Sequence, residues 1–297
     1  MQADDRSALA AAALGMTAVG VGVAVSARLT TYPVATAQAL RYAAAAAILT
    51  AMARRGGRRE PPPAARDRAR IWLVAATGMV LFNIAVVRAV TTGEPASVAT
   101  IVGCAPIVFA IAVPLLERRR PALPVVAGAC LVAAGAAVVE GVGTADAASI
   151  AWSVVALACE VAFTVVAAPV LRTTSPLELS RRACWIAAGM LALAGPALDG
   201  AGALRVPNGS ELAAIAYLAV AATVGAFVLW YGAVRRLGAE KVGLLCGLMP
   251  VAAAFAGVLV AGEPFRWRTL AGTDLVAIGL LLALATRPIR VRVRARG

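Results

Sequence analysis

Residues 95–116 read PASVATIVGCAPIVFAIAVPLL and are followed at once by Glu117 and three arginines, Arg118–Arg120. The stretch contains 22 residues and no charged side chain. An α-helix needs about 20 consecutive, mostly apolar residues to cross the hydrocarbon core of a bilayer. The stretch therefore predicts a membrane-spanning helix, and the basic run after it predicts the boundary at which the chain leaves the lipid.

Nine more stretches of this kind predict an all-α integral membrane protein with ten transmembrane helices. Hydrophobic residues make up 61% of the sequence and charged residues 14%, whereas a soluble domain is about half apolar and about a quarter charged. The first apolar stretch is longer than the core of a usual signal peptide, which favours a spanning helix over a cleaved leader. The one long polar connector lies at residues 54–70. The expected spans are 8–27, 33–52, 71–90, 95–116, 122–140, 149–171, 183–198, 211–233, 242–261 and 268–286.

The basic residues are distributed unevenly about these spans. If ten spans alternate in direction, 22 of the 28 basic residues fall on one side, four on the other and two within spans. Basic residues in short loops concentrate on the cytoplasmic side, so both termini are predicted to be cytoplasmic in a multi-pass protein of the cytoplasmic membrane. The net charge of +13 then reflects orientation, and no nucleic-acid partner is predicted. The basic tail at 287–297 is interpreted as an anchor on acidic headgroups.

Composition excludes several kinds of site. The sequence has no histidine, which removes His-based metal sites, His general bases and Ser-His-Asp triads. All five cysteines lie in apolar stretches without a CxxC pair, a pattern that indicates neither a disulfide framework nor a zinc site. No Walker-type phosphate-binding sequence is present, so nucleotide hydrolysis is not expected. We therefore expect no metal, no cofactor and no enzymatic activity.

The chain also resembles itself. The segment Ile101–Pro106 (IVGCAP) is matched 144 residues later by Leu245–Pro250 (LCGLMP). Each segment places a GxxP pattern inside an apolar stretch, and each stretch is followed by a glutamate, Glu117 or Glu263. Together with the ten spans, the match predicts two halves of five helices each.

Because five is an odd number, the second half must be inverted relative to the first. The predicted repeats cover residues 1–145 and 146–297. Inverted repeats are typical of secondary transporters, which hold their substrate at the repeat interface near the middle of the membrane. Pro106 and Pro250 are predicted to kink their helices and to take part in gating, because proline removes a backbone donor. The alternative is a packing kink that never meets substrate.

With these features the sequence resembles the drug/metabolite transporter superfamily, specifically the EamA-type transporters, over residues 8–286. The resemblance rests on the two repeat signatures and on residues 33–41, which run from a proline to an arginine like the family's second helix. The first helix departs from the family pattern, since Gly15, Gly20 and Gly22 stand where a tryptophan-glycine start is typical. The resemblance implies an exporter of small metabolites or drugs, either proton-linked or facilitated.

Two charges deep inside predicted spans are the main candidates for substrate binding or coupling. Glu160 and Arg41 lie about 16 Å and about 12 Å from the same side, where a charge costs about 2.5–3.5 kcal/mol on insertion scales. Glu160 is expected either to exchange a proton or to bind a cationic group, and a permanent ion pair with Arg41 is the structural alternative. Ser153 and Thr164 share its helical face and Phe163 lies beside them, which predicts a polar stripe that faces inward.

Further candidates lie on other spans. Asn83 is expected to hydrogen-bond across helices or to contact substrate. Asp274 is expected to line the cavity or to cap an outer vestibule. Tyr217 lies deep in its span and is a candidate for an aromatic cage around a cation. Trp230 and Tyr231 are alternative members of this cage, but their place near a span end favours a role as interfacial anchors.

Three functions are compatible with such a chain. A secondary transporter of a small molecule is favoured, because a scaffold has no need to keep charges inside the bilayer. A non-transporting membrane subunit is one alternative. An intramembrane lipid-modifying enzyme is another, but the sequence lacks the clustered aspartates or the metal-ligand set that it would need. The expected partners are a small-molecule substrate and the lipid bilayer, and the sequence specifies no oligomeric state.

Overall fold

The structure, a computed structural model, describes residues 3–57, 60–141, 143–262 and 264–285. Within these ranges the chain is helical, and its only extended pairing is one isolated bridge between Gly93 and Ala145. The uninterrupted long helices are α1 (Ala3–Ser26), α2 (Val34–Arg55), α7 (Leu123–Glu140), α8 (Ala147–Val170), α9 (Pro176–Asp199) and α14 (Trp267–Ala285). The others form interrupted rods: α3 (Ala65–Ala75) with α4 (Phe82–Thr92), α5 (Pro95–Val102) with α6 (Ala105–Leu116), α10 (Gly209–Ala219) with α11 (Ala226–Leu237), and α12 (Ala239–Gly243) with α13 (Leu248–Ala261).

Nine helices of the described chain are long and apolar enough to cross a membrane. The predicted span at 183–198 is not among them, although it lies inside the 24-residue helix α9. The first two turns of α9 carry Glu178, Arg181 and Arg182, and both arginines bind the glutamate at 2.6 Å. These charges lower the hydropathy of the helix, so length and composition alone do not identify it as a span.

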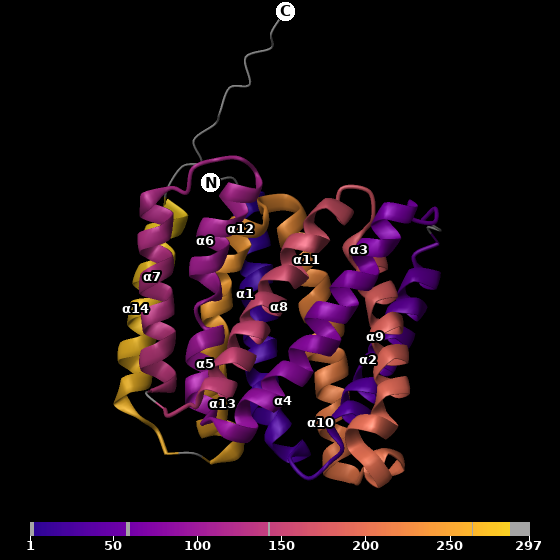
Figure 1. Ribbon diagram of the computed structural model, residues 1–297. Helices are drawn as coiled ribbons and strands as arrows, with labels where there is room; N and C mark the ends of the chain where they lie inside the picture. The colour runs from indigo at the N-terminus through magenta and orange to yellow at the C-terminus, as the bar shows by residue number, and fades with distance from the viewer. Residues whose placement is uncertain (1–2, 58–59, 142, 263, 286–297) are drawn as a thin grey trace, which may run out of the picture.

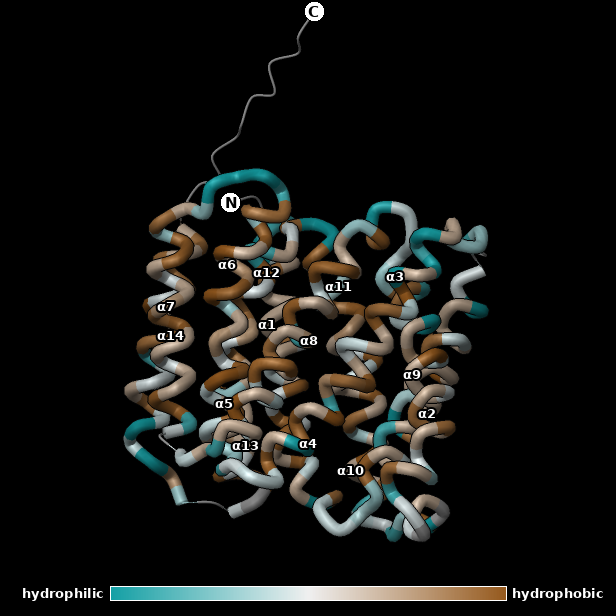
Figure 2. The backbone as a smooth tube through the Cα atoms, viewed as in Figure 1, coloured by the Kyte–Doolittle hydropathy of each residue, from teal (hydrophilic) through white to brown (hydrophobic). Residues whose placement is uncertain are grey.

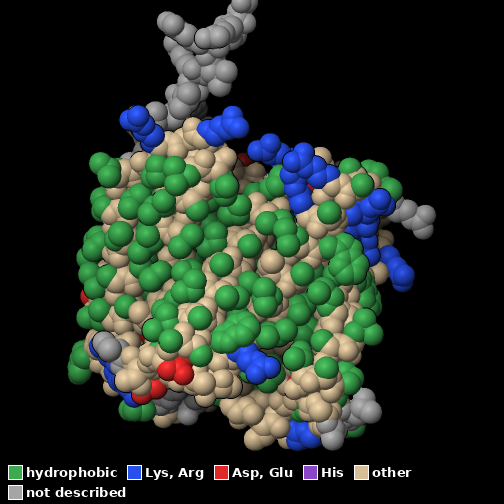
Figure 3. Space-filling model, in the orientation of Figure 1, with side chains coloured by type: hydrophobic (Ala, Val, Ile, Leu, Met, Phe, Trp, Pro, Cys, Tyr) green, Lys and Arg blue, Asp and Glu red, His purple; other side chains and the backbone are tan. Residues whose placement is uncertain are grey.

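The helices stand side by side in one bundle (Figure 1). The pair α7 and α14 forms one edge and the pair α2 and α9 the other, while α1 and α8 lie between them. Polar residues gather in the connections at both ends of the bundle, and hydrophobic residues follow the helices between them (Figure 2). On the surface, hydrophobic side chains cover the middle of the bundle. Most of the basic side chains in this view gather at one end (Figure 3).

We call that end the arginine-rich end. It is where α2 ends at Arg55, where Arg119 follows α6, and where α11 ends after Arg235 and Arg236. The start of α1 lies at this end too, because Arg236 Nη2 is 3.2 Å from the Asp4 carboxylate. The basic tail and Glu263 lie outside the described residues.

The edge pair α7 and α14 is packed through four glycines. A Cβ atom added to Gly128 would lie 2.6 Å from the carbonyl oxygen of Gly279, and one added to Gly135 would lie 2.6 Å from that of Gly272. The two pairs run in opposite order along the chain, so the helices are antiparallel. A shift of 144 residues converts Gly128 into Gly272 and Gly135 into Gly279. Each glycine contact therefore has a counterpart at the same sequence offset as the GxxP match.

The opposite edge is held at both ends of the helix pair. The side chain of Asp199, the last residue of α9, accepts hydrogen bonds from the backbone N–H groups of Ala35 (3.1 Å) and Thr36 (2.7 Å), which satisfies the first turn of α2. At the other end, the Trp185 indole N–H donates to Thr50 Oγ1 at 3.2 Å. The remaining helices are thereby packed between two edge pairs.

Candidate functional site

Two helices are interrupted near their middles at the predicted prolines. One rod breaks between α5 and α6, and Pro106 lies in the first turn of α6. The other contains the 3₁₀ turn Leu244–Gly247 (η5), and Pro250 lies in the first turn of α13. Proline is tolerated in the first turn of a helix, where its missing N–H leaves no bond unmade. The structure therefore has breaks just before both prolines, and their role in gating stays a prediction.

Two π-helical segments were not predicted from the sequence. They are η2 (Ala76–Leu81), between α3 and α4, and η4 (Val220–Gly225), between α10 and α11. Their bounds differ by 144 residues, the offset of the sequence repeat. A π segment shifts the backbone hydrogen-bond pattern and is frequent at functional sites. Each contains one glycine among small and β-branched residues, a pattern too common in this chain to reveal it.

Arg41 binds the π segment η4. Its Nε donates to Thr223 Oγ1 at 2.7 Å and its Nη2 donates to the Ala222 carbonyl oxygen at 3.3 Å. The Gln38 side-chain oxygen accepts from Nη1 at 3.2 Å, and the guanidinium carbon lies 5.1 Å from the centroid of the Tyr42 ring. Arg41 on α2 therefore holds a segment that belongs to the other half of the chain.

Glu160 lies on α8 and faces η5. The Cys246 thiol is 3.8 Å from its Oε1, which is within donor distance for sulfur. The side chain is half-buried. Among the described residues no salt bridge reaches Glu160, and the alternative of an ion pair with Arg41 is not formed in this structure. The carboxyl group is therefore free of a cationic partner here.

Three aromatic rings pack together beside Glu160. The ring of Phe163 lies 5.1 Å from that of Phe227 and 5.1 Å from that of Tyr231, measured between centroids. A Cβ on Gly78 would come within 2.2 Å of the Phe163 ring, so this glycine of η2 makes room for the cluster. The Tyr231 hydroxyl is buried without a hydrogen-bond partner among the described residues. Buried hydroxyls usually have a partner, so Tyr231 has a donor and acceptor to offer to a bound molecule.

The prediction that Trp230 and Tyr231 are interfacial anchors is wrong. Their exposed fractions are 2% and 0%. The Trp230 indole N–H donates to Thr164 Oγ1 at 3.0 Å, which joins α11 to α8 inside the bundle. Both residues lie at least one turn before Arg235, the residue that marks the end of this span. Distance from the expected span end suggested the interface, but the side of the helix on which they lie decides their burial.

Asn83 belongs to the same region. Its amide nitrogen donates to the Tyr42 hydroxyl at 3.2 Å and to the carbonyl oxygen of Met79, in η2, at 2.6 Å. The expected cross-helix hydrogen bond is therefore present. We call the polar and aromatic groups gathered here the central cluster: Glu160, Cys246, Phe163, Tyr231, Tyr42 and Asn83.

Three predicted residues lie outside the central cluster. The Ser153 hydroxyl is buried and donates to the Ser149 carbonyl oxygen at 2.7 Å, one turn earlier in α8. The Tyr217 hydroxyl donates to the Ala18 carbonyl oxygen at 3.2 Å and so links α10 to α1. Asp274 is exposed on α14, in the edge pair. Ser153 and Thr164 are buried and Glu160 is half-buried, so the predicted polar stripe of α8 faces inward, and its contact with substrate stays a prediction.

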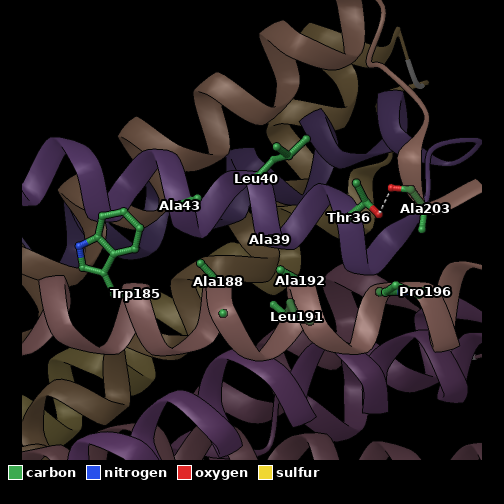
Figure 4. A pocket seen from close by; sticks show the side chains of 12 residues that line it. Thr36, Ala39, Leu40, Ala43, Trp185, Ala188, Leu191, Ala192, Pro196 and Ala203 are labelled. Atoms are coloured by element: carbon green, nitrogen blue, oxygen red, sulfur yellow. Dashed lines mark hydrogen bonds between the residues drawn. The ribbon is translucent and has the colours of Figure 1, made fainter.

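A large hollow lies on the side of the bundle rather than at its centre. It has a volume of about 470 Å³ and lies between the facing sides of α2 and α9, with Trp185 at one end and Thr36 at the other (Figure 4). Thr36 Oγ1 donates to the Ala203 carbonyl oxygen at 2.9 Å, and the remaining lining side chains are apolar. No titratable side chain lines this groove, so it lacks the groups that substrate coupling needs.

Comparison with known proteins agrees with this architecture. A sequence model of the EamA-like transporter family matches residues 6–140 and again residues 147–285. A solved structure described as "Crystal structure of protein" has the same fold, with a TM-score of 0.77 and 19% identity over 93% of this chain and 98% of that chain. No curated protein matches the sequence. Since the two successive family matches together cover nearly the whole helical part of the chain, this protein belongs to the EamA-like transporter family.

Proposed function

We propose that the protein is a secondary transporter that exports a small metabolite or drug across the cytoplasmic membrane by alternating access. In this proposal α9 also crosses the membrane, as the seventh of ten spans in chain order. Residues 1–145 and 146–297 then form two inverted five-helix repeats. Helices α1 and α8 support the repeat, because both have 24 residues and their bounds differ by 144. The π segments and the antiparallel glycine contacts of α7 and α14 share that offset.

Orientation follows from the distribution of basic residues. The arginine-rich end is placed in the cytoplasm, together with both termini, because short cytoplasmic loops carry the excess of arginine and lysine. A reporter that is active only in the cytoplasm, fused after residue 297, is expected to be active. A reporter that is active only outside the cytoplasm is expected to be active at the loop between α9 and α10. The opposite pattern would refute a ten-span protein with both termini in the cytoplasm.

One observation carries the assignment of Glu160 as the coupling residue. Its carboxyl group lies deep in a spanning helix, is half-buried, contacts the Cys246 thiol and has no cationic partner among the described residues. A lone carboxylate at this depth is costly and is usually kept for a purpose. A proton and a cationic group of the substrate can neutralise it alternately. These two neutralised states would be the two stages of a transport cycle. The rings of Phe163 and Tyr231 pack against each other beside Glu160.

Flux into proteoliposomes tests this role. Purified protein is first screened by thermal shift against amino acids, nucleosides and cationic drugs, and any stabilising compound is used as the transported solute. We expect Glu160→Gln to reduce flux at least about tenfold, because a hydrogen bond to a charged group contributes about 1.5–3 kcal/mol. The remaining flux is expected to lose its dependence on an imposed pH gradient.

Asp274→Asn is the matched control. It also removes one carboxylate from a spanning helix, but at an exposed position of the edge pair, so flux and its pH dependence should stay near those of the unaltered protein. If Glu160→Gln protein transported as fast as the control and kept its pH dependence, the coupling role would be refuted. If no compound were moved by the unaltered protein, the non-transporting subunit would be favoured instead.

A further inference from the structure

A second cavity opens at the arginine-rich end of the bundle. It has a volume of about 390 Å³ and lies among α6, α8, α11 and α12. Its floor is apolar and includes Val113, Val165 and Val234, while two arginines, Arg172 and Arg235, stand at its rim. We call this cavity the basic-rimmed pocket. Its size lies within the range of about 300–1,000 Å³ that is typical of small-molecule sites.

The two acidic groups near the pocket share one arginine as their partner. Arg119 Nη2 lies 2.6 Å from the Glu117 carboxylate and 2.6 Å from the Glu240 carboxylate. The hydrogen bonds with Glu240 and Glu117 raise the pKa of Arg119, so its charge is retained at any physiological pH. Glu117, although it lines the pocket, is therefore already paired with this arginine.

The two rim arginines have no such partner. Neither Arg172 nor Arg235 forms a salt bridge with another described residue, and both are exposed. Their guanidinium groups can bind a carboxylate or phosphate in a forked, bidentate way. Arginines at this end also serve to orient the protein, but that role does not require two of them to stand over an apolar cavity.

The pocket lies above the central cluster on the same helix. Val165 at its floor follows Glu160 by five residues, which is about 7.5 Å along α8. The pocket and Glu160 are thus separated by about one and a half turns of α8. Binding at the pocket is a separate step from binding at the central cluster. The charge of the molecule that the pocket prefers therefore does not fix the charge that the cluster prefers.

We propose that the basic-rimmed pocket is the loading site for a small organic anion, a molecule with a carboxylate or phosphate on an apolar body. The proposal rests on the proposed transport function and adds the chemical class of the molecule that is loaded. The anionic group binds Arg172 and Arg235, and the apolar body occupies the floor. The same chemistry is offered by a soluble metabolite and by the headgroup of an anionic lipid, and the experiment separates these sources.

Equilibrium binding to the full-length protein in phosphatidylcholine nanodiscs tests the proposal. The probe is radiolabelled 3-phenylpropionate, and 2-phenylethylamine serves as a probe of similar body and opposite charge. We expect saturable phenylpropionate binding whose Kd rises at least about tenfold in the Arg172→Gln/Arg235→Gln variant, because two charged hydrogen-bond donors are lost. The Arg172→Lys/Arg235→Lys variant keeps the positive rim and should lie between the two.

The matched control is Arg54→Gln/Arg55→Gln, which removes the same charge at the arginine-rich end but outside the pocket. Its Kd should stay within threefold of that of the unaltered protein. The proposal is overturned if the unaltered protein shows no saturable binding, or if the control loses as much affinity as the rim variant. It is also overturned if the rim variant weakens phenylethylamine binding equally. Should the glutamine variant fail to fold, the lysine variant supplies the same comparison.

Replacing part of the phosphatidylcholine with phosphatidylglycerol identifies the source of the anion. Competition by this lipid in the unaltered protein but not in the rim variant assigns the pocket to a lipid headgroup. Unchanged probe affinity assigns it to a soluble anion, and equal weakening in both proteins counts against a defined site. Because binding needs no flux, the outcome is independent of the Glu160 experiment. Rim-dependent binding with normal flux in Glu160→Gln protein would refute the coupling role alone.

Discussion

The two matched segments of the chain share their irregular backbone and differ in their chemistry. Both contain a π segment at the same sequence offset, η2 in one and η4 in the other. Both contain a helix break next to a proline, Pro106 or Pro250. Such features cost stability unless neighbouring groups satisfy the freed backbone. Their occurrence in pairs indicates that the fold requires them at these positions in each half.

The carboxyl group of Glu160, in contrast to these backbone features, is not repeated in the other half. A shift of 144 residues takes Glu160 on α8 to Met16 on α1, a residue that is 7% exposed and packs in the main core. The same shift takes Cys246 to Val102, which is also buried and apolar. The bounds of the helices and π segments therefore recur at this offset, whereas the carboxyl group of Glu160 has no counterpart at the matching position. A single carboxyl group gives one place where a proton and a substrate compete.

Placing a second carboxyl group at the matching position should have the largest effect. Met16→Glu buries a carboxylate in an apolar environment that offers no cation. We expect a loss of about 3 kcal/mol, or on the order of 5 to 10 °C in the unfolding midpoint of a chain of this size. Thermal unfolding of the purified protein, followed by size-exclusion fluorescence, measures the shift.

Met16→Leu controls for the loss of the thioether, since swaps that conserve volume usually cost less than about 1.5 kcal/mol. If Met16→Glu protein were as stable as the leucine variant, a polar space would have to exist beside α1 as well. The two halves would then differ at this position in the residue they carry but not in the environment around it.

The contrast also explains what could be predicted from the sequence. Apolar stretches and arginine-bearing loops follow from the solvent that each residue meets, so the helical membrane fold and the internal repeat were accessible from the sequence. Glu160 and Asn83 were identified because a polar side chain deep in a span is unusual. Tyr231 was misplaced, because burial depends on which side of α11 meets α8. The partner of Arg41 was missed for a related reason, since η4 has no sequence signal and lies in the other half.

The glycine contacts of the α7–α14 edge should respond as a matched pair. Gly128→Ala and Gly272→Ala each place a Cβ 2.6 Å from a backbone oxygen of the facing helix. Backbone cannot move aside cheaply, so we expect each to lose about 1–3 kcal/mol in the same thermal assay. If the two halves correspond, the two losses should agree within about 0.5 kcal/mol.

Gly189→Ala is the control for this pair, because nothing lies within 4 Å of a Cβ added there. Alanine also favours a helix over glycine by up to about 1 kcal/mol, so this variant should be neutral or more stable. Strongly unequal losses at Gly128 and Gly272 would show that the offset of 144 residues does not describe equivalent environments at this edge.

The smallest effect concerns the way in which the two π segments are held. In η2 the Met79 carbonyl oxygen is bound by Asn83, four residues away, whereas η4 is bound by Arg41 from a distant helix. Arg41→Gln and Thr223→Val should therefore couple, with an interaction energy of about 1 kcal/mol in a double-mutant cycle on thermal stability. Thr77, in η2, bonds only within its own helix, at the Leu73 carbonyl oxygen.

Arg41→Gln combined with Thr77→Val should accordingly be additive within about 0.5 kcal/mol. Coupling at Thr223 together with additivity at Thr77 would show that only the second π segment is tied to the opposite half through a charge. Equal coupling in both cycles would mean that Arg41 stabilises the whole bundle rather than η4. The difference between the two segments would then lie in their local hydrogen bonds. Arg41 would have no specific role in holding η4 against the other half of the chain.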